Sequence, residues 1–577
     1  MAALVDIADV SKSFGAEAAA LRNITAAIQA GAITGLVGPD GAGKTTLIRL
    51  IAGLMMPDTG SVRVFGLETR TDAARIQADI GYMPQRCGLY EDLTVQENLR
   101  LYADLRGLPL AARGETFARL LEFTGLAPFT GRLAGQLSGG MKQKLGLACA
   151  LIQTPKLLLL DEPSVGVDPI SRRELWRMVE ELRDRGIGIL WSTAYLDEAE
   201  RCGQVILLNE GQMLFHGAPR DLTGRVAGRV VRLTNIQGNR RKVLAAALDR
   251  PGVIDGVIQG SAVRLVLAAD IAAADVMRTA SDPDAAITVV SAEPRFEDAF
   301  IDILGGGPAG ESRLAQAMPQ MPDRGAPVIE AHGLTKRFGS FVAAEDMTFA
   351  IPRGEIFGLL GPNGAGKSTT FKMLCGLLPP SAGDGRVAGI DLRHARADAR
   401  GRLGYMAQKF SLYGDLSVLQ NLEFFAGVYG LSGAHRRRQI DAMLGTFDLV
   451  RRAGDSARDL PLGFKQRLAL ACAVMHGPEA LFLDEPTSGV DPITRREFWT
   501  HINGLVEKGV AVLVTTHFMD EAEYCDRIGL IYRGRTIALG SPDELKARVA
   551  RTGIADPTLE DAFIAMVEAS DAAREAA

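Results

Sequence analysis

The chain contains two copies of one sequence, and this duplication limits the fold more than any other feature. GPDGAGKTT, beginning at Gly38, returns as GPNGAGKSTT at Gly361, and the DEP segment at Asp161 returns at Asp484. Each pair is 323 positions apart, as are GYMPQ and GYMAQ and the two DEAE segments. This constant offset predicts that one fold of about 215 residues occurs twice, with almost no insertions across its middle.

The repeat spacing changes near the end of the first copy. FEDAFI at Phe296 matches LEDAFI at Leu559 with an offset of only 263, so the first copy holds about 60 further residues near 225–292. Apolar periodicity there predicts strand, helix, strand, strand, helix and strand, with the helices at RKVLAAALDR and AADVMRTA. The order is that of a ferredoxin-like βαββαβ subdomain, for which a regulatory or docking module and a structural appendage both remain open.

These boundaries divide the chain into five parts. We expect the first α/β domain over 1–224, the small α+β subdomain over 225–304, a linker over 305–327, the second α/β domain over 328–566 and a tail over 567–577. Gly and Pro in GGGPAGESRLAQAMPQMPDRGAP predict that the linker is mobile.

Composition narrows the class of protein. The 577 residues are 47% hydrophobic and 23% charged with a net charge of −5, which argues against a broadly basic nucleic-acid-binding protein. The sequence has no apolar run of about 18 residues, so no membrane span is expected. Its start lacks the basic n-region of a secretory signal peptide. Six cysteines without a CxxC pair predict reduced thiols rather than a disulfide or zinc framework. A channel, a secreted protein and a fibre are therefore not expected.

Each copy has a strand, a glycine-rich loop and a helix that fit G-x-x-x-x-G-K-[ST]. Backbone N–H groups of such a loop wrap a phosphate, the lysine supplies a cation, and the hydroxyl reaches Mg²⁺. The first loop comprises Gly38, Pro39, Asp40, Gly41, Ala42, Gly43, Lys44, Thr45 and Thr46, and the second comprises Gly361, Pro362, Asn363, Gly364, Ala365, Gly366, Lys367, Ser368 and Thr369. Two loops in this context predict two nucleotide sites.

An apolar strand in each copy ends in two carboxylates, Asp161–Glu162 and Asp484–Glu485. Ligands bind at the carboxyl ends of strands in open α/β sheets. The aspartate can hold the Mg²⁺ shell, and the glutamate can polarise an attacking water. A solvated strand end is the alternative, which the neighbouring phosphate loop disfavours.

With these motifs the chain resembles the ATP-binding cassette ATPases. The resemblance rests on the phosphate loops, the DEP strands, Gln85 and Gln408, LSGGMKQ at Leu137 and TTHFMDEAE at Thr515. It implies an α/β fold with two P-loop cassette domains in tandem and the ferredoxin-like insert after the first. It also implies that the cassettes pair head to tail, so that the signature loop of one closes over the ATP of the other.

The resemblance assigns roles to individual residues. Glu485, His517 and Glu162 are expected to be catalytic, and Mg²⁺ is assigned to Thr45, Asp161, Ser368, Asp484, Gln85 and Gln408. Further ATP contacts are assigned to Gln85, Gln408, Ser138, Gly139, Gly140, Phe14 and Phe338. A packed core position is the alternative for the two phenylalanines, and a helix N-cap is the alternative to an inter-domain role for Asp168 and Asp491.

The two sites are expected to be unequal. The second signature reads LPLGFKQ, so Pro461 and Leu462 replace the serine and first glycine of LSGG. Ala194 stands where the second copy has His517. In a head-to-tail pair, the altered second signature and the missing histidine would both fall on the site built on the first phosphate loop. The sequence therefore predicts one hydrolytic site and one degenerate site.

The EDAFI tails and GVDP loops resemble the ATPases of bacterial multidrug-efflux exporters. This likeness implies separate integral membrane permease subunits as partners, with a periplasmic adaptor left open, and a place at the cytoplasmic face of the inner membrane. The stretches after the two glutamines are expected to form part of the permease-binding groove, with a core helix start as the alternative. A tandem sugar-importer ATPase and a ribosome-associated translation factor are the other candidates. No nucleic acid and no zinc are expected.

Overall fold

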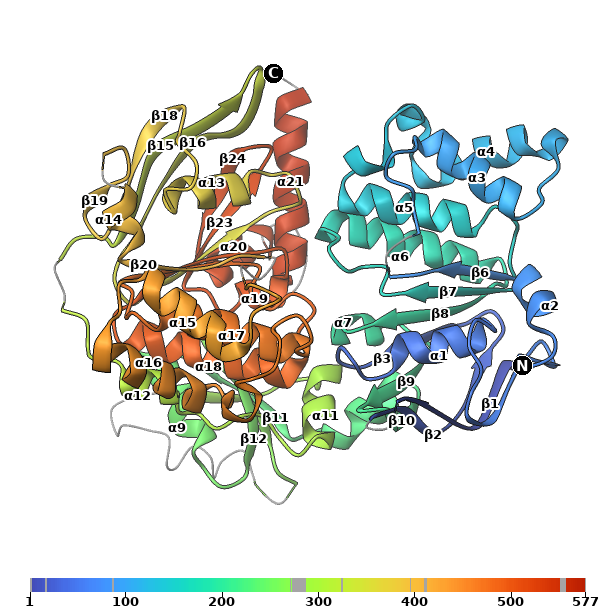
Figure 1. The fold of residues 1–577 in the computed structure, drawn as a ribbon, viewed down its shortest axis with the longest axis horizontal. Helices are drawn as coiled ribbons and strands as arrows, with labels where there is room; N and C mark the ends of the chain where they lie inside the picture. Colours follow the sequence, from blue (N-terminus) through green and yellow to red (C-terminus); the bar gives the residue numbers. More distant parts are fainter. Residues whose placement is uncertain are drawn as a thin grey trace. The chain divides into compact units, whose positions relative to one another are not determined.

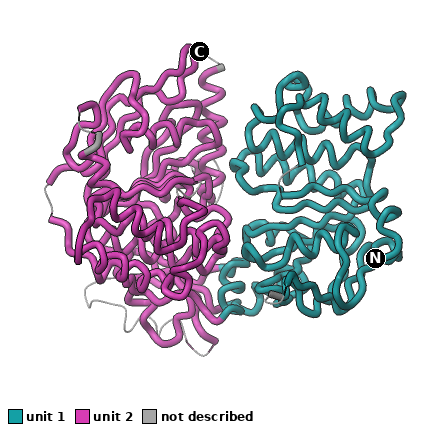
Figure 2. The backbone as a smooth tube through the Cα atoms, in the orientation of Figure 1, with its two compact units in different colours: residues 1–227, 293–304 teal, residues 228–292, 305–577 magenta. Residues whose placement is uncertain are grey.

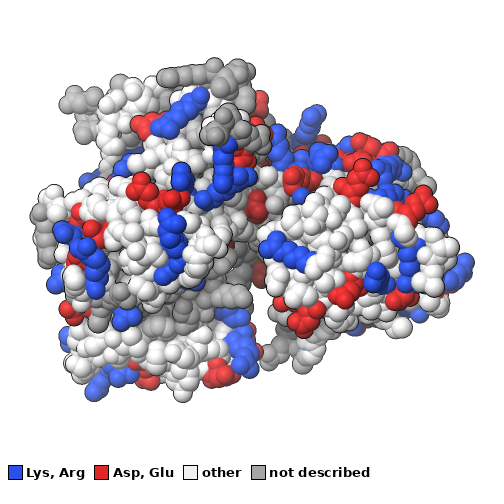
Figure 3. All heavy atoms as spheres, turned by 90° about the horizontal axis from the view of Figure 1, so that it is seen from above, with Lys and Arg blue, Asp and Glu red and all other residues white. Residues whose placement is uncertain are grey.

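The computed structural model describes residues 3–15, 18–85, 88–269, 271, 287–322, 325–394, 396–408, 412–550 and 557–575. They form two compact units, one of residues 1–227 with 293–304 and one of residues 228–292 with 305–577 (Figure 2). Within these described ranges, no helix combines the length and the hydropathy that a membrane crossing needs. On the face drawn in Figure 3, basic and acidic side chains are mixed among the described residues of each unit.

The core of the first unit is a six-stranded sheet in the order β10-β9-β3-β8-β7-β6. Its strands are β3 (Ile33–Val37), β6 (Ile80–Met83), β7 (Leu157–Asp161), β8 (Gly188–Thr193), β9 (Gln204–Asn209) and β10 (Gln212–Gly217). The pairs from β6 to β9 are parallel, and β10 is antiparallel to β9. Strands β3, β7 and β8 are buried along their whole length, which explains why their sequences are apolar runs rather than alternating patterns.

A second, antiparallel sheet in this unit has the order β2-β1-β4-β5. It consists of β1 (Ala3–Phe14), β2 (Ala18–Gln29), β4 (Thr59–Val64) and β5 (Leu67–Glu68). The helices are α1 (Lys44–Ile51), α2 (Ala73–Ala78), α3 (Val95–Leu105), α4 (Leu110–Thr124), α5 (Gly139–Ala150), α6 (Pro169–Asp184), α7 (Leu196–Ala199), α8 (Pro219–Thr223) and α11 (Phe296–Ile303), with short 3₁₀ turns η1 (Ala127–Phe129), η2 (Ala134–Gln136) and η3 (Gly224–Val226). Helices α3, α4 and α5 pack together beyond the β6 edge (Figure 1).

The second unit repeats this topology. Its sheets have the orders β20-β21-β22-β17-β23-β24 and β16-β15-β18-β19. The strands are β15 (Ile329–Phe338), β16 (Phe341–Ile351), β17 (Ile356–Leu360), β18 (Ala382–Val387), β19 (Ile390–Asp391), β20 (Leu403–Met406), β21 (Ala480–Asp484), β22 (Ala511–Thr516), β23 (Arg527–Tyr532) and β24 (Arg535–Gly540). The helices are α13 (Lys367–Leu374), α14 (Arg396–Arg400), α15 (Val418–Val428), α16 (Gly433–Thr446), α17 (Leu462–Val474), α18 (Pro492–Glu507), α19 (Met519–Ala522), α20 (Pro542–Ala550) and α21 (Leu559–Glu575), with η4 (Val450–Arg452). The expected tail continues helix α21 rather than starting after it.

The extra residues of the first copy form a small antiparallel sheet in the order β12-β13-β11-β14. It contains β11 (Val230–Thr234), α9 (Arg240–Leu248), β12 (Val253–Gln259), β13 (Ala262–Leu267) and β14 (Thr288–Ser291). This is the strand order of a ferredoxin-like βαββαβ unit. The second helix expected at AADVMRTA lies outside the described residues. Residues 228–292 cluster with the second unit, whereas helix α11, which ends the sequence expected for this subdomain, belongs to the first.

The sequence between the cassettes is not the mobile linker that its glycines and prolines predict. Helix α12 (Arg313–Ala317) packs on α18, with Leu314 only 1% exposed. The hydroxyl of Ser312 lies 3.0 Å from Nδ1 of His501, and the amide of Met321 donates to the carbonyl of Lys508 at 2.8 Å. The expectation of mobility is wrong for these residues because the apolar side chains of RLAQAM have a partner surface.

Replacing Leu314 with Ala is expected to destabilise the second unit by about 2–5 kcal/mol, because a buried leucine leaves a cavity. Differential scanning calorimetry should show a lower melting temperature, and amide exchange should speed up over Ser312–Met321. Arg313→Ala, at an exposed position of the same helix, is the control. Equal melting temperatures for the two variants would mean that the packing contributes nothing.

Candidate nucleotide-binding sites

The two phosphate loops depend on one glycine each, immediately before the helix. Gly43 has φ 103° and Gly366 has φ 105°, a region that L side chains rarely adopt. A Cβ at Gly43 would lie 2.4 Å from the carbonyl oxygen of Ala20, and one at Gly366 would lie 2.4 Å from that of Ala343. The backbone of each loop can therefore turn its N–H groups toward a phosphate only if these residues are glycine.

The loop lysines are the first residues of α1 and α13, and both are buried. Nζ of Lys44 donates to the carbonyls of Gly38 at 2.7 Å and Pro39 at 2.9 Å. Nζ of Lys367 makes the same two contacts in the second unit, at 2.5 and 3.1 Å. Each ammonium is thus held against its own loop, beside the N-terminus of a helix that favours anions.

In the first unit, β7 ends at Asp161 and Glu162 follows with φ 51°. Oε1 of Glu162 lies 2.9 Å from Nζ of Lys44, and its Oε2 accepts from Gln85 at 3.4 Å. Burial raises the pKa of Asp161, and the hydroxyls of Thr45 and Ser192 oppose that shift. The predicted loop, strand-end and glutamine residues of the first copy therefore converge on one place.

The second unit brings together the corresponding residues and adds a histidine. Glu485, with φ 48°, accepts from Gln408 at 2.6 Å and lies 3.0 Å from Nδ1 of His517. Asp484 accepts a hydrogen bond from the hydroxyl of Thr515. Burial alone would raise the pKa of Glu485, but the hydrogen bond and charge of His517, with Lys367, lower it overall. Glu485 is therefore a carboxylate at neutral pH.

The strand-end aspartates suit a hard divalent cation. Both oxygens of Asp161 are buried and have no hydrogen-bond partner among the described residues. The hydroxyl of Thr45 lies close enough to affect the carboxyl group, and oxygen donors of this kind are the ligands that Mg²⁺ prefers. The residues present therefore fit the ion that the motif implies.

The residue that follows β8 in the first unit corresponds to the residue that follows β22 in the second, and the two differ only in their side chains. Thr193 accepts from the amide of Tyr195 at 2.9 Å, and Thr516 accepts from that of Phe518 at 2.9 Å. Between these residues lies Ala194 in the first unit and His517 in the second. Nε2 of His517 is buried without a hydrogen-bond partner in the described structure, so it is available to a ligand.

The two signature helices also keep their fold and differ in side chains. Ser138 is the exposed N-cap of α5, and its hydroxyl accepts from the amide of Met141 at 3.3 Å. Pro461 is the N-cap of α17 without a side-chain hydrogen bond, and Leu462 is the first helical residue. A proline at a helix start costs little, which is why the helix survives a change that removes a hydroxyl.

The comparisons with known proteins agree with this geometry. The sequence profile of the family described as "ABC transporter" matches residues 21–165 and 344–488. The chain is 58% identical over 567 residues to "Probable multidrug ABC transporter ATP-binding protein YbhF" of Escherichia coli (strain K12), covering 98% of both chains. The chain belongs to the ABC transporter family. It carries two ABC cassettes in tandem, as the motifs predicted, and it is an ATP-binding ATPase of that family.

Single-cassette relatives match part of the chain. "Linearmycin resistance ATP-binding protein LnrL" of Bacillus subtilis (strain 168) is 36% identical over 244 residues, covering 42% of this chain and 78% of that protein. A solved structure titled "Structure of ATP binding subunit of ABC transporter" is 30% identical with a TM-score of 0.39, covering 42% of this chain and 99% of the other.

The structure decides two alternatives left open by the sequence. Phe14 and Phe338 are 54% and 51% exposed at the ends of β1 and β15, so they are not core residues. Asp168 and Asp491 are the N-caps of α6 and α18, where their carboxylates accept from the amides of the third helical residues. The N-cap interpretation of these aspartates is thus confirmed, while an inter-domain role for them stays a prediction.

Sequence reasoning assigned no role to the first glutamate of each DEAE segment. Glu521 is buried and accepts from the hydroxyl of Thr516 at 2.6 Å, next to His517. Glu198 accepts from the indoles of Trp176 and Trp191 at 3.2 and 2.9 Å. Burial raises the pKa of both carboxyl groups. The exact repetition of DEAE was the only sequence sign that these residues matter. It did not reveal that one carboxylate of each segment is buried in the core.

Replacing His517 with Ala is expected to raise the pKa of Glu485, because burial remains and the imidazole that opposes it is lost. A glutamate that polarises water must be ionised, so the acidic limb of the ATPase pH profile should move to higher pH. The maximal rate should fall about 10²–10³-fold with the lost donor. His332→Gln, at a half-exposed histidine on β15, is the control. An unshifted acidic limb would show that His517 does not set the ionisation of the base.

Proposed function

We propose that this protein is the ATP-hydrolysing subunit of a drug or multidrug exporter and drives separate membrane permease subunits. The observation that carries the proposal is the 58% identity to YbhF over 98% of both chains, which includes the residues between the cassettes. The protein would act at the cytoplasmic face of the inner membrane. A sugar-importer ATPase and a translation factor are less well supported, because the family likeness to exporters extends through the EDAFI helices.

Each step of hydrolysis has a candidate group in the second cassette. Lys367 and the loop N–H groups would bind the phosphates, and Ser368, Asp484 and Gln408 would hold Mg²⁺. Mg²⁺, when bound, would offset the negative charge of the β- and γ-phosphates. Glu485 would accept the proton of the attacking water, and Nε2 of His517 would contact the γ-phosphate.

The first cassette would bind ATP but turn it over slowly. It keeps Lys44, Thr45, Asp161 and Glu162, and the backbone around Ala194 is hydrogen-bonded as in the second cassette. The missing histidine therefore removes a donor without displacing the other groups. If the cassettes pair head to tail as in the family, Pro461 and Leu462 face this same site. Losing one positioned donor commonly costs about 2.7–4 kcal/mol in the transition state.

The competent site would combine the second phosphate loop with the first signature. Ser138 is exposed at the start of α5, and Gly139 and Gly140, which follow it, are half-buried and buried. A Cβ at Gly140 would lie 2.4 Å from Ser171. The glycine therefore keeps α5 packed on α6, while Ser138 would be the residue presented to a nucleotide.

The unequal sites predict unequal mutants. Glu485→Gln keeps the size of the side chain and removes its charge, so steady-state ATPase activity should fall at least about 10²-fold. Glu162→Gln in the degenerate site should retain most of the activity. Phosphate release under saturating ATP measures both variants, and nucleotide binding confirms that each loop is intact. Equal losses would refute the asymmetry.

The stretches after the two glutamines have an exposed aromatic surface suited to a permease helix. Tyr90 and Tyr413 are 57% and 50% exposed, although Asn98 and Asn421 fix their backbones through paired hydrogen bonds. Each stretch then enters a helix whose inner face is buried. A rigid loop with outward-facing aromatics costs little entropy when a partner binds.

Replacing Tyr413 with Ala should reduce co-purification of the permease subunits from detergent-solubilised membranes at least about fivefold, while ATPase activity in solution is kept. Phe341→Ala, at an exposed aromatic on β16, is the matched control. Ribosome co-sedimentation of the wild-type protein, with no permease recovered, would favour the translation-factor alternative instead.

A further inference from the structure

The small ferredoxin-like sheet belongs to a different unit from the residues on either side of it. Residues 228–292 cluster with the second cassette, but residues 1–227 and 293–304 form the first unit. Residues 305–322 then return to the second unit and contact the same sheet, since the amide of Gly307 donates to Ile254 at 3.0 Å. We call the described residues 228–269, 271, 287–292 and 305–322 together the clamp.

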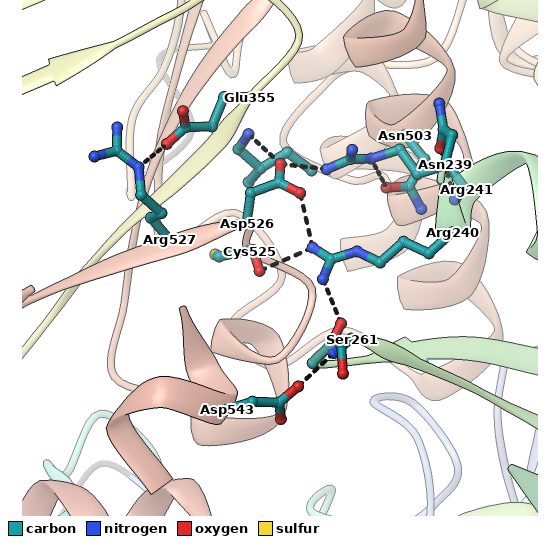
Figure 4. A network of polar contacts seen from close by, with 12 residues as sticks. Asn239, Arg240, Arg241, Ser261, Glu355, Asn503, Cys525, Asp526, Arg527 and Asp543 are labelled. Carbon is teal, nitrogen blue, oxygen red and sulfur yellow. Dashed lines mark hydrogen bonds and ion pairs between the residues drawn. The ribbon is translucent and has the colours of Figure 1, made fainter. Parts of the chain in front are cut away.

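Two neighbouring arginines at the start of α9 bind one aspartate of the second cassette (Figure 4). Arg240 lies 2.8 Å from Oδ1 of Asp526, and Arg241 lies 2.5 Å from its Oδ2. Arg241 also donates to Oδ1 of Asn503 on α18 at 3.1 Å. Oδ2 of Asp526 accepts in addition from the amide of Ile356, the first residue of β17.

A buried ion pair forms a second contact. Oδ2 of Asp255 on β12 lies 3.1 Å from Nε of Arg496 on α18, and both side chains are over 90% buried, at 3% and 6% exposure. Arg496 also donates to the hydroxyl of Tyr524 at 2.7 Å, and Tyr524 stacks on Trp499 with ring centroids 4.7 Å apart. A buried charge is tolerated only while its partner is in place, so this pair strongly disfavours separation.

Backbone contacts extend the interface at both ends. The amide of Ser261 donates to Asp543 at 2.7 Å, and that of Gly260 donates to the carbonyl of Glu523 at 3.2 Å. At the other end, helix α12 packs on α18 through Leu314, as described above. None of these contacts uses a residue of the phosphate site.

The surface that receives the clamp exists on only one cassette. At the 323-residue offset, the acceptor residues Asn503, Tyr524, Asp526 and Asp543 correspond to Glu180, Arg201, Gly203 and Arg220 of the first cassette. The aspartate that binds both arginines is thus a glycine there, two positions are basic, and one, Glu180, is acidic. Without the shared carboxylate, the first cassette cannot form the contacts that α9 makes with the second one.

We propose that the clamp is an intramolecular docking module that keeps the second cassette bound to the first half of the chain whether or not ATP is present. Its residues follow the first cassette in sequence and bind the second one through contacts independent of nucleotide. The clamp would therefore stay on the second cassette after hydrolysis, when contacts through ATP are lost. This inference concerns association and does not depend on the exporter function.

The test uses the full chain with a site-specific protease sequence inserted after Pro322, which is exposed and follows the last clamp contact. After cleavage, the first fragment carries the first cassette and the whole clamp, and the second carries the second cassette. Size-exclusion chromatography with light scattering is run in EDTA without nucleotide. The cleaved wild-type protein should elute as one complex.

The double variant R240A/R241A should raise the dissociation constant of the fragments at least about 30-fold, because Asp526 loses both charged partners. Lys242→Ala removes an exposed positive charge from the same helix. This control should change the dissociation constant of the fragments by no more than about twofold. Asp526→Gly tests the other side of the contact with the residue that the first cassette carries, so it keeps the cassette foldable and should weaken association as well.

Separation of the cleaved wild-type fragments in EDTA would overturn the proposal. Wild-type affinity in both R240A/R241A and Asp526→Gly would overturn it too, and circular dichroism of each uncut variant identifies any that fails to fold. Because no ATPase activity is read, a negative result here leaves the exporter assignment untouched, and the reverse also holds.

Discussion

A buried glutamate in left-handed backbone conformation stands at the centre of each cassette, and its charge has to be balanced there. Glu162 has φ 51° and an ammonium at 2.9 Å, whereas Glu485 has φ 48° and an imidazole at 3.0 Å with an amide at 2.6 Å. Parallel strands deliver both residues to the same edge of the sheet, beside the loop lysine. The glycine-rich loops, the buried strands and the helix N-termini all contribute to this arrangement, because a buried carboxylate stays ionised only while charged or hydrogen-bonding partners balance it.

Near the two candidate sites the copies differ in side chains without losing the local fold. Pro461 caps α17 without a hydrogen bond where Ser138 caps α5 with one, and both helices run on for at least three turns. Ala194 keeps the threonine-to-amide bond that flanks His517 in the other copy. By contrast, Gly43 and Gly366 are both retained, because a Cβ at either would overlap a carbonyl at 2.4 Å. The loop glycines, which packing constrains, are thus identical, whereas the signature position and the position after the buried strand have changed.

The sequence was sufficient for the parts of the fold that depend on local pattern. Loop glycines, buried strands and carboxylates at strand ends carry their geometry in a few neighbouring residues, and the βαββαβ periodicity matched the observed strand order. Local sequence pattern could not predict that the small sheet packs in the same unit as the second cassette. Arg240 and Asp526 are 286 residues apart, and neither lies in a motif. The packing of α12 was hidden for a related reason: Gly and Pro dominate the composition around it, while the fit of Leu314 depends on a groove formed by another helix.

The clamp binds the cassette that carries His517, and two of its contacts lie on elements that lead to the candidate site. Asp526 accepts from two clamp arginines and from the amide of Ile356, where β17 begins. Four residues later, at Leu360, β17 ends immediately before the phosphate loop. Arg496, paired with Asp255 of the clamp, lies on α18, whose N-cap Asp491 belongs to the loop after the catalytic strand. The clamp thus contacts two elements that lead to the candidate site without contacting the phosphate loop itself. The first cassette has Gly203 where the second has Asp526, so it cannot form the same contact with the two arginines.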